Sequence, residues 1–331
     1  IRNCLVGSEM CIRDRGISEA NSIASWLASA TSYSHASTPT MPFYIFYSMF
    51  GFQRVNDQIW QAADARARGF LMGATAGRTT LNGEGLQHQD GHSLLHASTV
   101  PYCRSWDPAY AYELATIIRH GINEMWGENL DVFHYIMLYN QNEQQPAKPE
   151  GIDNEIIKGA YKIRESKNND KPLVRLLGSG PILSHVLEAS EILANYDIDS
   201  EVWSVTSYGE LRREGLESQR TNRLYPDVET SSYVSKCFGD LTTTIAVSDY
   251  IIAVPEMIQR WVGGNYVVLG TDGFGRSDDR SELRRFFEID TESIVLSTVS
   301  ALEREGRIKT GFTEEIANKL NISRERNDKT N

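Results

Sequence analysis

Residues 41–93 read MPFYIFYSMFGFQRVNDQIWQAADARARGFLMGATAGRTTLNGEGLQHQDGHS, and this stretch is the most informative about the fold. It begins with an aromatic run and ends in a glycine-rich loop that closes on histidines. Pro39, just before this stretch, and Pro42 exclude an earlier helix, so residues 41–50 are predicted to form a buried strand that enters a helix over 53–67. The apolar residues 70–76 predict a second short strand, which opens into the glycine-rich loop.

The rest of the chain continues this alternation of strands and helices. Strands are predicted at 132–140, 172–180, 200–208, 242–250 and 265–275, and helices at 16–34, 108–126, 182–194, 250–262, 293–305 and 313–322. This spacing predicts an α/β fold with parallel or mixed sheets that helices cover on both faces. A segment rich in Gln, Asn, Lys and Pro divides the pattern, so we expect two domains, 16–150 and 172–331, joined by a linker at 151–171.

The composition is that of an ordinary globular protein, with 40% hydrophobic and 23% charged residues in a chain of 331. The net charge of −11 argues against nucleic acid or an anionic membrane surface as the main partner. Cys4, Cys11, Cys103 and Cys237 are widely spaced and predict neither a zinc site nor a disulfide framework. No window reaches the ~18 apolar residues of a membrane span. These features predict a soluble, cytoplasmic protein.

The first 15 residues, IRNCLVGSEMCIRDR, lack the apolar core and small-residue cleavage site of a signal peptide. They do not begin with Met, and they do not match the family pattern described below. We therefore expect residues 1–15 to be a non-native leader, and the natural sequence, which begins near Gly16, to be a C-terminal fragment.

Three side chains near the start of the chain are candidates for chemistry, and each has an ordinary structural alternative. Glu19 begins the first expected helix, where an acid commonly interacts with the helix dipole. Tyr47 and Phe50 belong to an aromatic run, which would normally be core but which also offers a ring face for a flat ligand.

The glycine-rich loop carries His88, His92 and His96, four residues apart, as metal ligands on one helix face would be. Gly91 weakens a continuous helix and no carboxylate pattern completes a known metal motif, so we predict no metal site here. The sequence GATAGRTTLNGEG at 73–85 is neither a Walker motif nor GxGxxG. Its glycines predict tight turns near a ligand.

The longest motifs of the chain resemble one enzyme family. They are PFYIFYSMFGFQR, GRTTLNGEGLQHQDGHS, DPAYAYE, LGSG, SVTSY and LGTDGFGRSD. Over about residues 16–325 the chain resembles the homodimeric type of pyruvate dehydrogenase, the thiamine-diphosphate-dependent decarboxylase of the pyruvate dehydrogenase complex. The resemblance implies two α/β domains of the transketolase-like superfamily, a pyrimidine-binding domain to about residue 150 and then a C-terminal domain.

The resemblance also implies roles for four side chains. In this family a glutamate hydrogen-bonds a ring nitrogen of the cofactor's aminopyrimidine, and Glu19 takes its place, which implies a buried carboxyl group. Phe50 takes the stacking role on the pyrimidine, and Tyr47 lies at the pyrimidine pocket. His88 takes the place of a loop histidine that contacts the substrate or intermediate, and the other two histidines are expected to hold the loop.

The implied reaction is the oxidative decarboxylation of pyruvate, with transfer of the acetyl group to the lipoyl domain of dihydrolipoyl acetyltransferase. The implied enzyme is a homodimer whose diphosphate and Mg²⁺ site lies on an N-terminal domain that this chain lacks, so the isolated fragment is expected to be inactive. Two alternatives stay open. A transketolase-type ketol transferase shares the architecture but carries a GPTHQ-like sequence where this chain has GLQHQDGHS, and a non-catalytic binding subunit would need no complete site.

Overall fold

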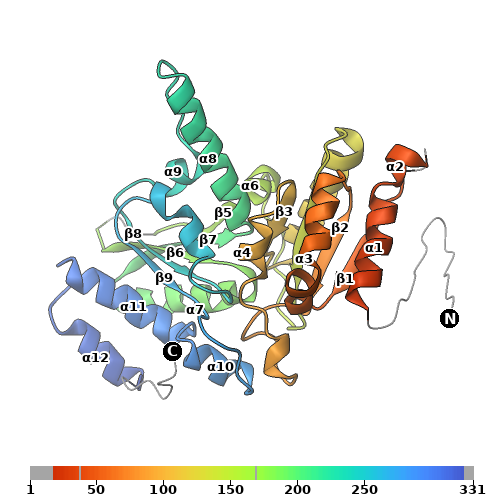
Figure 1. The fold of residues 1–331 in the computed structure, drawn as a ribbon. Coiled ribbons are helices and arrows are strands. Elements are labelled where there is room, and N and C mark those ends of the chain that lie inside the picture. Colours follow the sequence, from red (N-terminus) through yellow and green to blue (C-terminus); the bar gives the residue numbers. More distant parts are fainter. Residues whose placement is uncertain (1–17, 37–38, 168–169, 324–331) are drawn as a thin grey trace.

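The computed structural model describes residues 18–36, 39–167 and 170–323 and shows two α/β units side by side (Figure 1). The first unit is built on a four-stranded sheet with the order β1-β2-β4-β3, in which all strands are parallel. Its strands are β1 (Phe43–Phe46), β2 (Phe70–Ala74), β3 (Cys103–Trp106) and β4 (Phe133–Leu138). The expected leader at 1–15 lies outside the described residues.

The second unit is built on a five-stranded sheet with the order β5-β7-β6-β8-β9. Only β5 runs antiparallel to its neighbour, and the other pairs are parallel. Its strands are β5 (Ala160–Arg164), β6 (Leu173–Gly178), β7 (Asp199–Val205), β8 (Thr243–Val247) and β9 (Tyr266–Leu269). The expected fold class, α/β with parallel or mixed sheets, is confirmed: the first sheet is parallel and the second is mixed.

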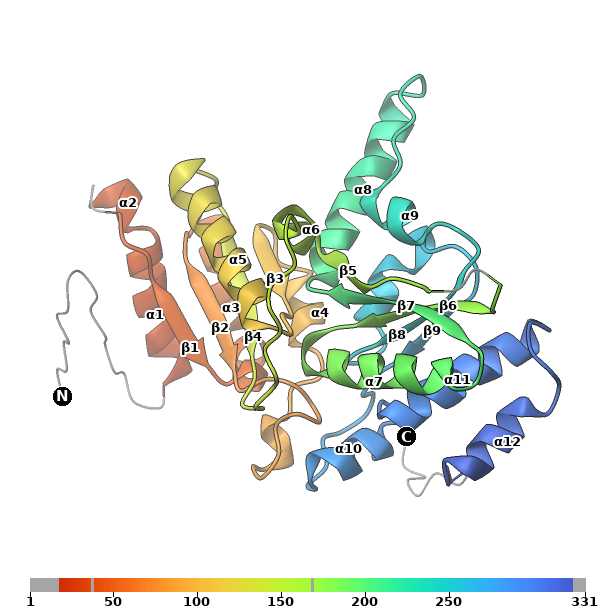
Figure 2. The same ribbon diagram turned by 180° about the vertical axis from the view of Figure 1, so that it is seen from behind.

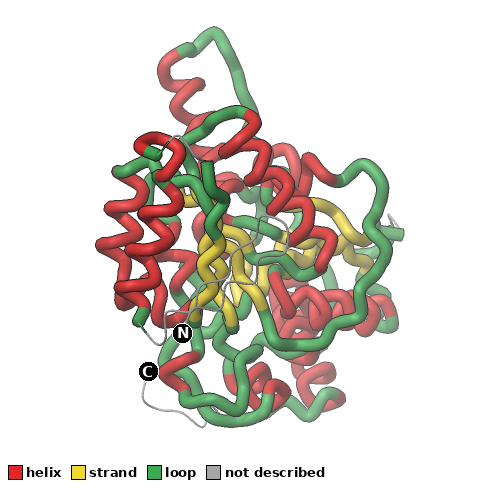
Figure 3. The backbone as a smooth tube through the Cα atoms, turned by 90° about the vertical axis from the view of Figure 1, so that its right-hand side faces the viewer, coloured by secondary structure: helices red, strands yellow, loops and turns green. Residues whose placement is uncertain are grey.

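Helices cover both faces of the strands, as a view along the molecule shows (Figure 3). In the first unit α1 and α3 lie in front of the sheet in Figure 1, whereas α5 covers its other face in Figure 2. The α-helices are α1 (Glu19–Ala30), α2 (Ser32–His35), α3 (Ser48–Asp64), α4 (Ser93–Ala97), α5 (Ala111–Ile122), α6 (Asp153–Lys158), α7 (Leu183–Ala194), α8 (Tyr208–Leu224), α9 (Tyr233–Phe238), α10 (Arg280–Phe286), α11 (Thr291–Arg304) and α12 (Phe312–Lys319). Short 3-10 or π turns occur at Leu86–His88, Asn123–Gly127, Gly180–Ile182 and Pro255–Trp261.

Helix α1 shows how sequence spacing places an element. Ile23, Trp26 and Ala30 recur at helical spacing, and all three are buried against the sheet. The Trp26 indole N–H also donates to the carbonyl of Phe70 at 3.1 Å, which fastens the helix to β2. The first helix is therefore held by both apolar burial and a buried hydrogen bond.

The expectation that 41–50 begins with a buried strand is wrong in one respect. Among the described residues, strand β1 forms the edge of the sheet and pairs only with β2. Phe43 and Ile45 on it are 47% and 64% exposed. An apolar run cannot reveal whether a strand has one neighbour or two, because that depends on distant segments.

The segment 151–171 contains regular structure. It includes α6 and β5, and β5 pairs with β7 of the second sheet. The elements that the sequence did not predict include β3 in the first sheet and α8 in the second unit. Helix α8 projects from the body of the molecule (Figure 1). No helix of the described part is long and apolar enough to cross a membrane.

Candidate active site

The four side chains singled out from the sequence gather at the carboxyl end of the first sheet. Tyr47 directly follows β1, Phe50 lies in the first turn of α3, and the loop after β2 carries His88. Glu19 begins α1 and reaches the side of α3. Ligands of open parallel sheets bind beyond the carboxyl ends of the strands, so this is the expected side for a site.

His88 packs edge-on against two aromatic rings. Its ring centre lies 4.9 Å from that of Phe50 and 5.1 Å from that of Tyr47, and those two rings are 5.9 Å apart. The His88 Nδ1 lies 3.2 Å from the carbonyl oxygen of Gly85. Because a carbonyl can only accept, this contact favours the tautomer with the proton on Nδ1 and leaves a lone pair on Nε2.

The aromatic run divides into core and site. Phe46 and Phe52 are 7% and 2% exposed and belong to the core. Tyr47 is 41% exposed and Phe50 is half-buried, so neither ring is a core residue. Phe43, on the edge strand, is also exposed, although an aromatic run would normally be core.

Arg54 connects Glu19 to the ring cluster, and the sequence analysis did not identify it. Its guanidinium Nη1 lies 2.7 Å from Glu19 Oε1, and its Cζ lies 3.9 Å from the centre of the Phe50 ring. The signal in the sequence was the spacing, since Arg54 follows Phe50 by four residues on one helix. The Glu19 side chain is 20% exposed and ion-paired, so it is less buried than the resemblance implies.

The other two loop histidines pack against each other. His92 precedes α4 and His96 lies on it, and their ring centres are 5.1 Å apart. His92 Nε2 lies 2.5 Å from the side-chain amide of Gln53 on α3, and burial lowers the pKa of His92. Within the described ranges, no group of three His, Cys, Asp or Glu side chains could hold a metal ion.

Buried carboxyl groups lie where the two units meet. Asp107, just after β3, accepts a hydrogen bond from the Tyr139 hydroxyl, and burial raises the pKa of Asp107 to about 7. Glu113 accepts hydrogen bonds from the hydroxyls of Tyr161 and Ser204 in the second unit, both at 2.7 Å. Burial raises the pKa of Glu113 as well. These groups join the units away from the ring cluster.

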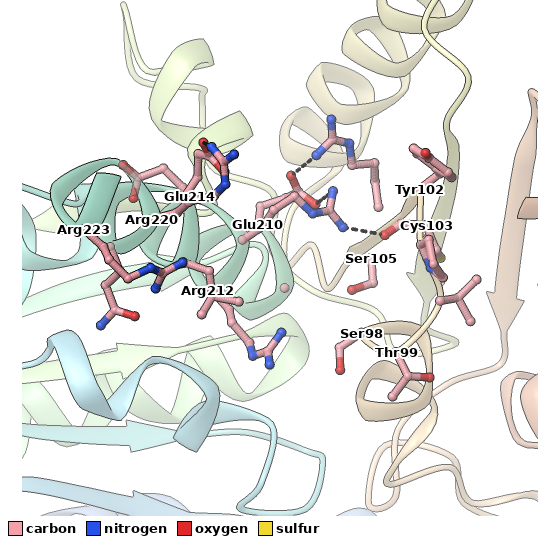
Figure 4. Close-up of a pocket in the computed structure, with 18 residues that line it drawn as sticks. Ser98, Thr99, Tyr102, Cys103, Ser105, Glu210, Arg212, Glu214, Arg220 and Arg223 are labelled. Carbon is pink, nitrogen blue, oxygen red and sulfur yellow. Dashed lines mark hydrogen bonds and ion pairs between the residues drawn. The ribbon is translucent and has the colours of Figure 1, made fainter. Parts of the chain in front are cut away.

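A separate groove of about 940 Å³ runs between the two units along α8 (Figure 4). Its walls are residues 98–105 and the part of α8 from 209 to 223. Across it Arg104 pairs with Glu210 at 2.8 Å, and Arg213 donates to the carbonyl of Cys103 at 2.8 Å. None of the four candidate side chains lines this groove, so it is distinct from the ring cluster.

The ring cluster suits the pyrimidine half of thiamine diphosphate. It offers a carboxylate to hydrogen-bond a ring nitrogen, a half-exposed aromatic ring on which a flat heterocycle can stack, and an imidazole beside that ring.

Family comparisons divide the chain into the same two units. The family of the pyruvate dehydrogenase E1 component middle domain matches residues 7–146, and that of the transketolase-like C-terminal domain matches residues 159–290. The first match begins inside the segment 1–15. The second begins just before β5 and so includes the antiparallel strand of the second sheet.

Curated relatives extend over both units. A pyruvate dehydrogenase E1 component from Pseudomonas aeruginosa is 52% identical over 319 residues, which cover 95% of this chain and 36% of the relative. The one from Escherichia coli K12 is 48% identical over 315 residues, which cover 94% of this chain and 35% of the relative. The chain thus spans about a third of the length of these relatives.

Solved structures share the fold at low identity. Transketolase from Leishmania mexicana matches with a TM-score of 0.62 at 17% identity, over 80% of this chain and 34% of that one. A split gene transketolase, described as an inactive beta4 tetramer, matches with a TM-score of 0.60 at 16% identity, over 87% of this chain and 83% of that one. With both domain families and both curated relatives in agreement, the chain belongs to the family of the pyruvate dehydrogenase E1 component and comprises its middle and C-terminal domains.

Proposed function

We propose that this chain provides the pyrimidine-binding half of a thiamine-diphosphate site in a pyruvate dehydrogenase. The observation that carries the proposal is the convergence of Glu19, Tyr47, Phe50 and His88 at one end of the first sheet. They come from three segments that lie far apart in the sequence, so chain proximity does not explain their meeting. The curated relatives are named pyruvate dehydrogenase E1 components, which supports pyruvate rather than a sugar phosphate as the substrate.

Each side chain has a distinct task in this proposal. When bound, thiamine diphosphate supplies the electron sink for decarboxylation of a 2-oxo acid. The Phe50 ring stacks on the pyrimidine, with Tyr47 beside it. The Glu19 carboxyl group holds a proton at a pyrimidine nitrogen, and His88 binds the carboxylate or carbonyl oxygen of pyruvate and exchanges protons there.

Among the described residues no group of three His, Cys, Asp or Glu side chains could hold the Mg²⁺ that accompanies the diphosphate. We assign the diphosphate and Mg²⁺ ligands to the part of the relatives outside the matched third, and to the other subunit of a homodimer. The acetyl group would pass to the lipoyl domain of dihydrolipoyl acetyltransferase in the cytoplasm. On this proposal residues 16–150 and 172–331, the latter together with β5, are the two working domains, and the isolated chain turns over no pyruvate.

Titration calorimetry with thiamine tests the proposal on the chain as it stands. Stacking of a base on an aromatic ring is worth roughly 1–3 kcal/mol, so Phe50→Ala should raise the Kd for thiamine about tenfold. Glu19→Gln removes a charge-assisted hydrogen bond worth about 1.5–3 kcal/mol and should raise the Kd by a similar factor or more. Phe43→Ala is the matched control, because Phe43 is an exposed ring of the same run outside the cluster.

The expected pattern is therefore weaker binding for two variants and unchanged binding for the third. Equal affinity of all four proteins, or no binding by the wild-type chain at millimolar thiamine, would refute the proposed pyrimidine site.

A further inference from the structure

One buried carboxylate of the second unit binds the start of the loop that carries His88, where the Arg280 guanidinium also donates to the Thr80 carbonyl at 2.6 Å. Asp249 lies two residues after β8 and is 1% exposed. Its Oδ1 accepts from the amide and the hydroxyl of Thr79 at 2.8 and 2.7 Å. Its Oδ2 accepts from the amide and the hydroxyl of Thr80 at 3.0 and 2.6 Å. Four donors from two consecutive loop residues thus converge on one side chain.

The far end of the same loop is also bound to the second unit. The Gln89 side-chain amide donates to the carbonyl of Arg276 at 2.8 Å, and the Arg276 amide donates back to Gln89 Oε1 at 2.8 Å. The same Gln89 amide reaches the Leu81 carbonyl at 3.0 Å, and the Ile251 amide donates to the Gly91 carbonyl at 2.8 Å. The loop is therefore tied on both sides of His88.

His88 itself has few constraints of its own. Its backbone amide and its Nδ1 both contact the carbonyl of Gly85, which belongs to the same loop. Its remaining described contacts are the edge-on packing against Tyr47 and Phe50. The position of the imidazole thus depends on the residues that hold the ends of the loop.

We propose that Asp249 is a positioning residue, through which the C-terminal domain fixes the loop that presents His88 to the active site. The inference rests on the proposed role of His88. It gives the second unit a part in the site although none of its side chains lies in the ring cluster.

An aspartate is specifically required in this position. Asparagine would keep one carbonyl oxygen but would turn an N–H group toward donors of Thr79 or Thr80, which leaves buried donors without an acceptor. The Asp249 carboxylate also lies close to the backbone of Gly77. A Cβ added at Gly77 would lie 2.3 Å from Asp249 Oδ2, and Gly77 has a φ of +89°, so a side chain is excluded on both counts.

Hydrogen exchange of the purified chain, followed by mass spectrometry, tests the proposal with Asp249→Asn. The variant leaves donors of Thr79 or Thr80 without an acceptor, so the amides of residues 82–90 should exchange faster than in wild type, on the order of tenfold or more. Diethyl pyrocarbonate should also label His88 several times faster, with the exposed His35 as internal reference. The thiamine Kd should stay within about threefold of wild type, because Glu19 and Phe50 lie off the loop.

Glu113→Gln is the matched control. Glu113 is also fully buried, also accepts four hydrogen bonds and also joins the two units, but it does not touch the loop. Glu113→Gln should lower Tm about as much as Asp249→Asn does, but should leave amide exchange at 82–90 at the wild-type rate. If both variants free the loop equally, or neither does, Asp249 has no positioning role.

A milder pair covers the case in which Asp249→Asn fails to fold. Thr80→Val removes the hydroxyl that donates to Asp249 Oδ2 at 2.6 Å and keeps the branched shape, whereas Thr80→Ser keeps this hydroxyl. Exchange at 82–90 should rise for T80V and stay at the wild-type rate for T80S, and equal rates would overturn the proposal. If D249N speeds exchange at 82–90 but the wild-type chain binds no thiamine, the proposed function is refuted and the positioning role of Asp249 is supported.

Discussion

Asp107→Asn should remove a loss of stability that the wild-type chain suffers as the pH rises. Burial raises the pKa of Asp107 from 3.8 to about 7, although Tyr139 and Ser179 donate to it. Between these two values the folded chain keeps the proton while the unfolded chain releases it. Stability from this group is therefore fully present below about pH 4 and is lost as the pH rises to about 7. At ~1.36 kcal/mol for each pKa unit, the loss is about 4 kcal/mol.

Urea unfolding at pH 4 to 8, followed by far-UV circular dichroism, measures the effect. Asparagine cannot ionise, so the stability of the variant relative to wild type should rise by about 4 kcal/mol over this range. Subtracting the two curves removes the contribution of every other titrating group. Glu113→Gln should shift in the same direction, because burial raises that pKa too. Parallel curves for wild type and D107N would refute the reasoning.

Three further predictions concern packing and ligand choice. Gly77→Ala should lower the free energy of unfolding by more than ~2 kcal/mol in thermal melts, because the left-handed φ costs about 1 kcal/mol and the new Cβ would lie 2.3 Å from Asp249. Gly83→Ala, at φ +75° with no atom within 4 Å of the new Cβ, should show only the backbone cost. Trp26→Phe should lower the free energy of unfolding by roughly 1–3 kcal/mol, because it removes the indole N–H that donates to the Phe70 carbonyl. Trp60→Phe, at a 53% exposed position, should change Tm little, and equal effects of the two variants would contradict the argument. Thiamine and thiamine diphosphate should bind this chain within about threefold of each other, with or without Mg²⁺, because the proposed site binds the pyrimidine; a large, Mg²⁺-dependent preference for the diphosphate would contradict the division of the site.

Local patterns in the sequence sufficed for most of the fold. Prolines and apolar runs placed β1, β2 and the start of α3 within a few residues, and the spacing of Ile23, Trp26 and Ala30 placed the buried face of α1. The edge position of β1 was missed because it depends on which strands lie beside it. Helix α8 was missed because most of it is polar and projects from the core.

In the site, too, contacts between residues close in sequence could be predicted, whereas contacts between distant residues could not. Tyr47, Phe50 and Arg54 lie within two helical turns, so their proximity can be read from spacing. The contact of Asp249 with Thr79 joins residues 170 positions apart and has no local signature. Only the folded arrangement of the two units reveals that a strand end in the second sheet holds a loop of the first.

The most direct test of the central claim is an NMR measurement of where thiamine lies on this chain. With phenylalanine and tyrosine rings labelled, nuclear Overhauser effects from the pyrimidine protons should reach the rings of Phe50 and Tyr47, and Glu19→Gln should weaken them. Contacts instead to the groove between residues 98–105 and α8, or none to the ring cluster at saturating thiamine, would contradict the account.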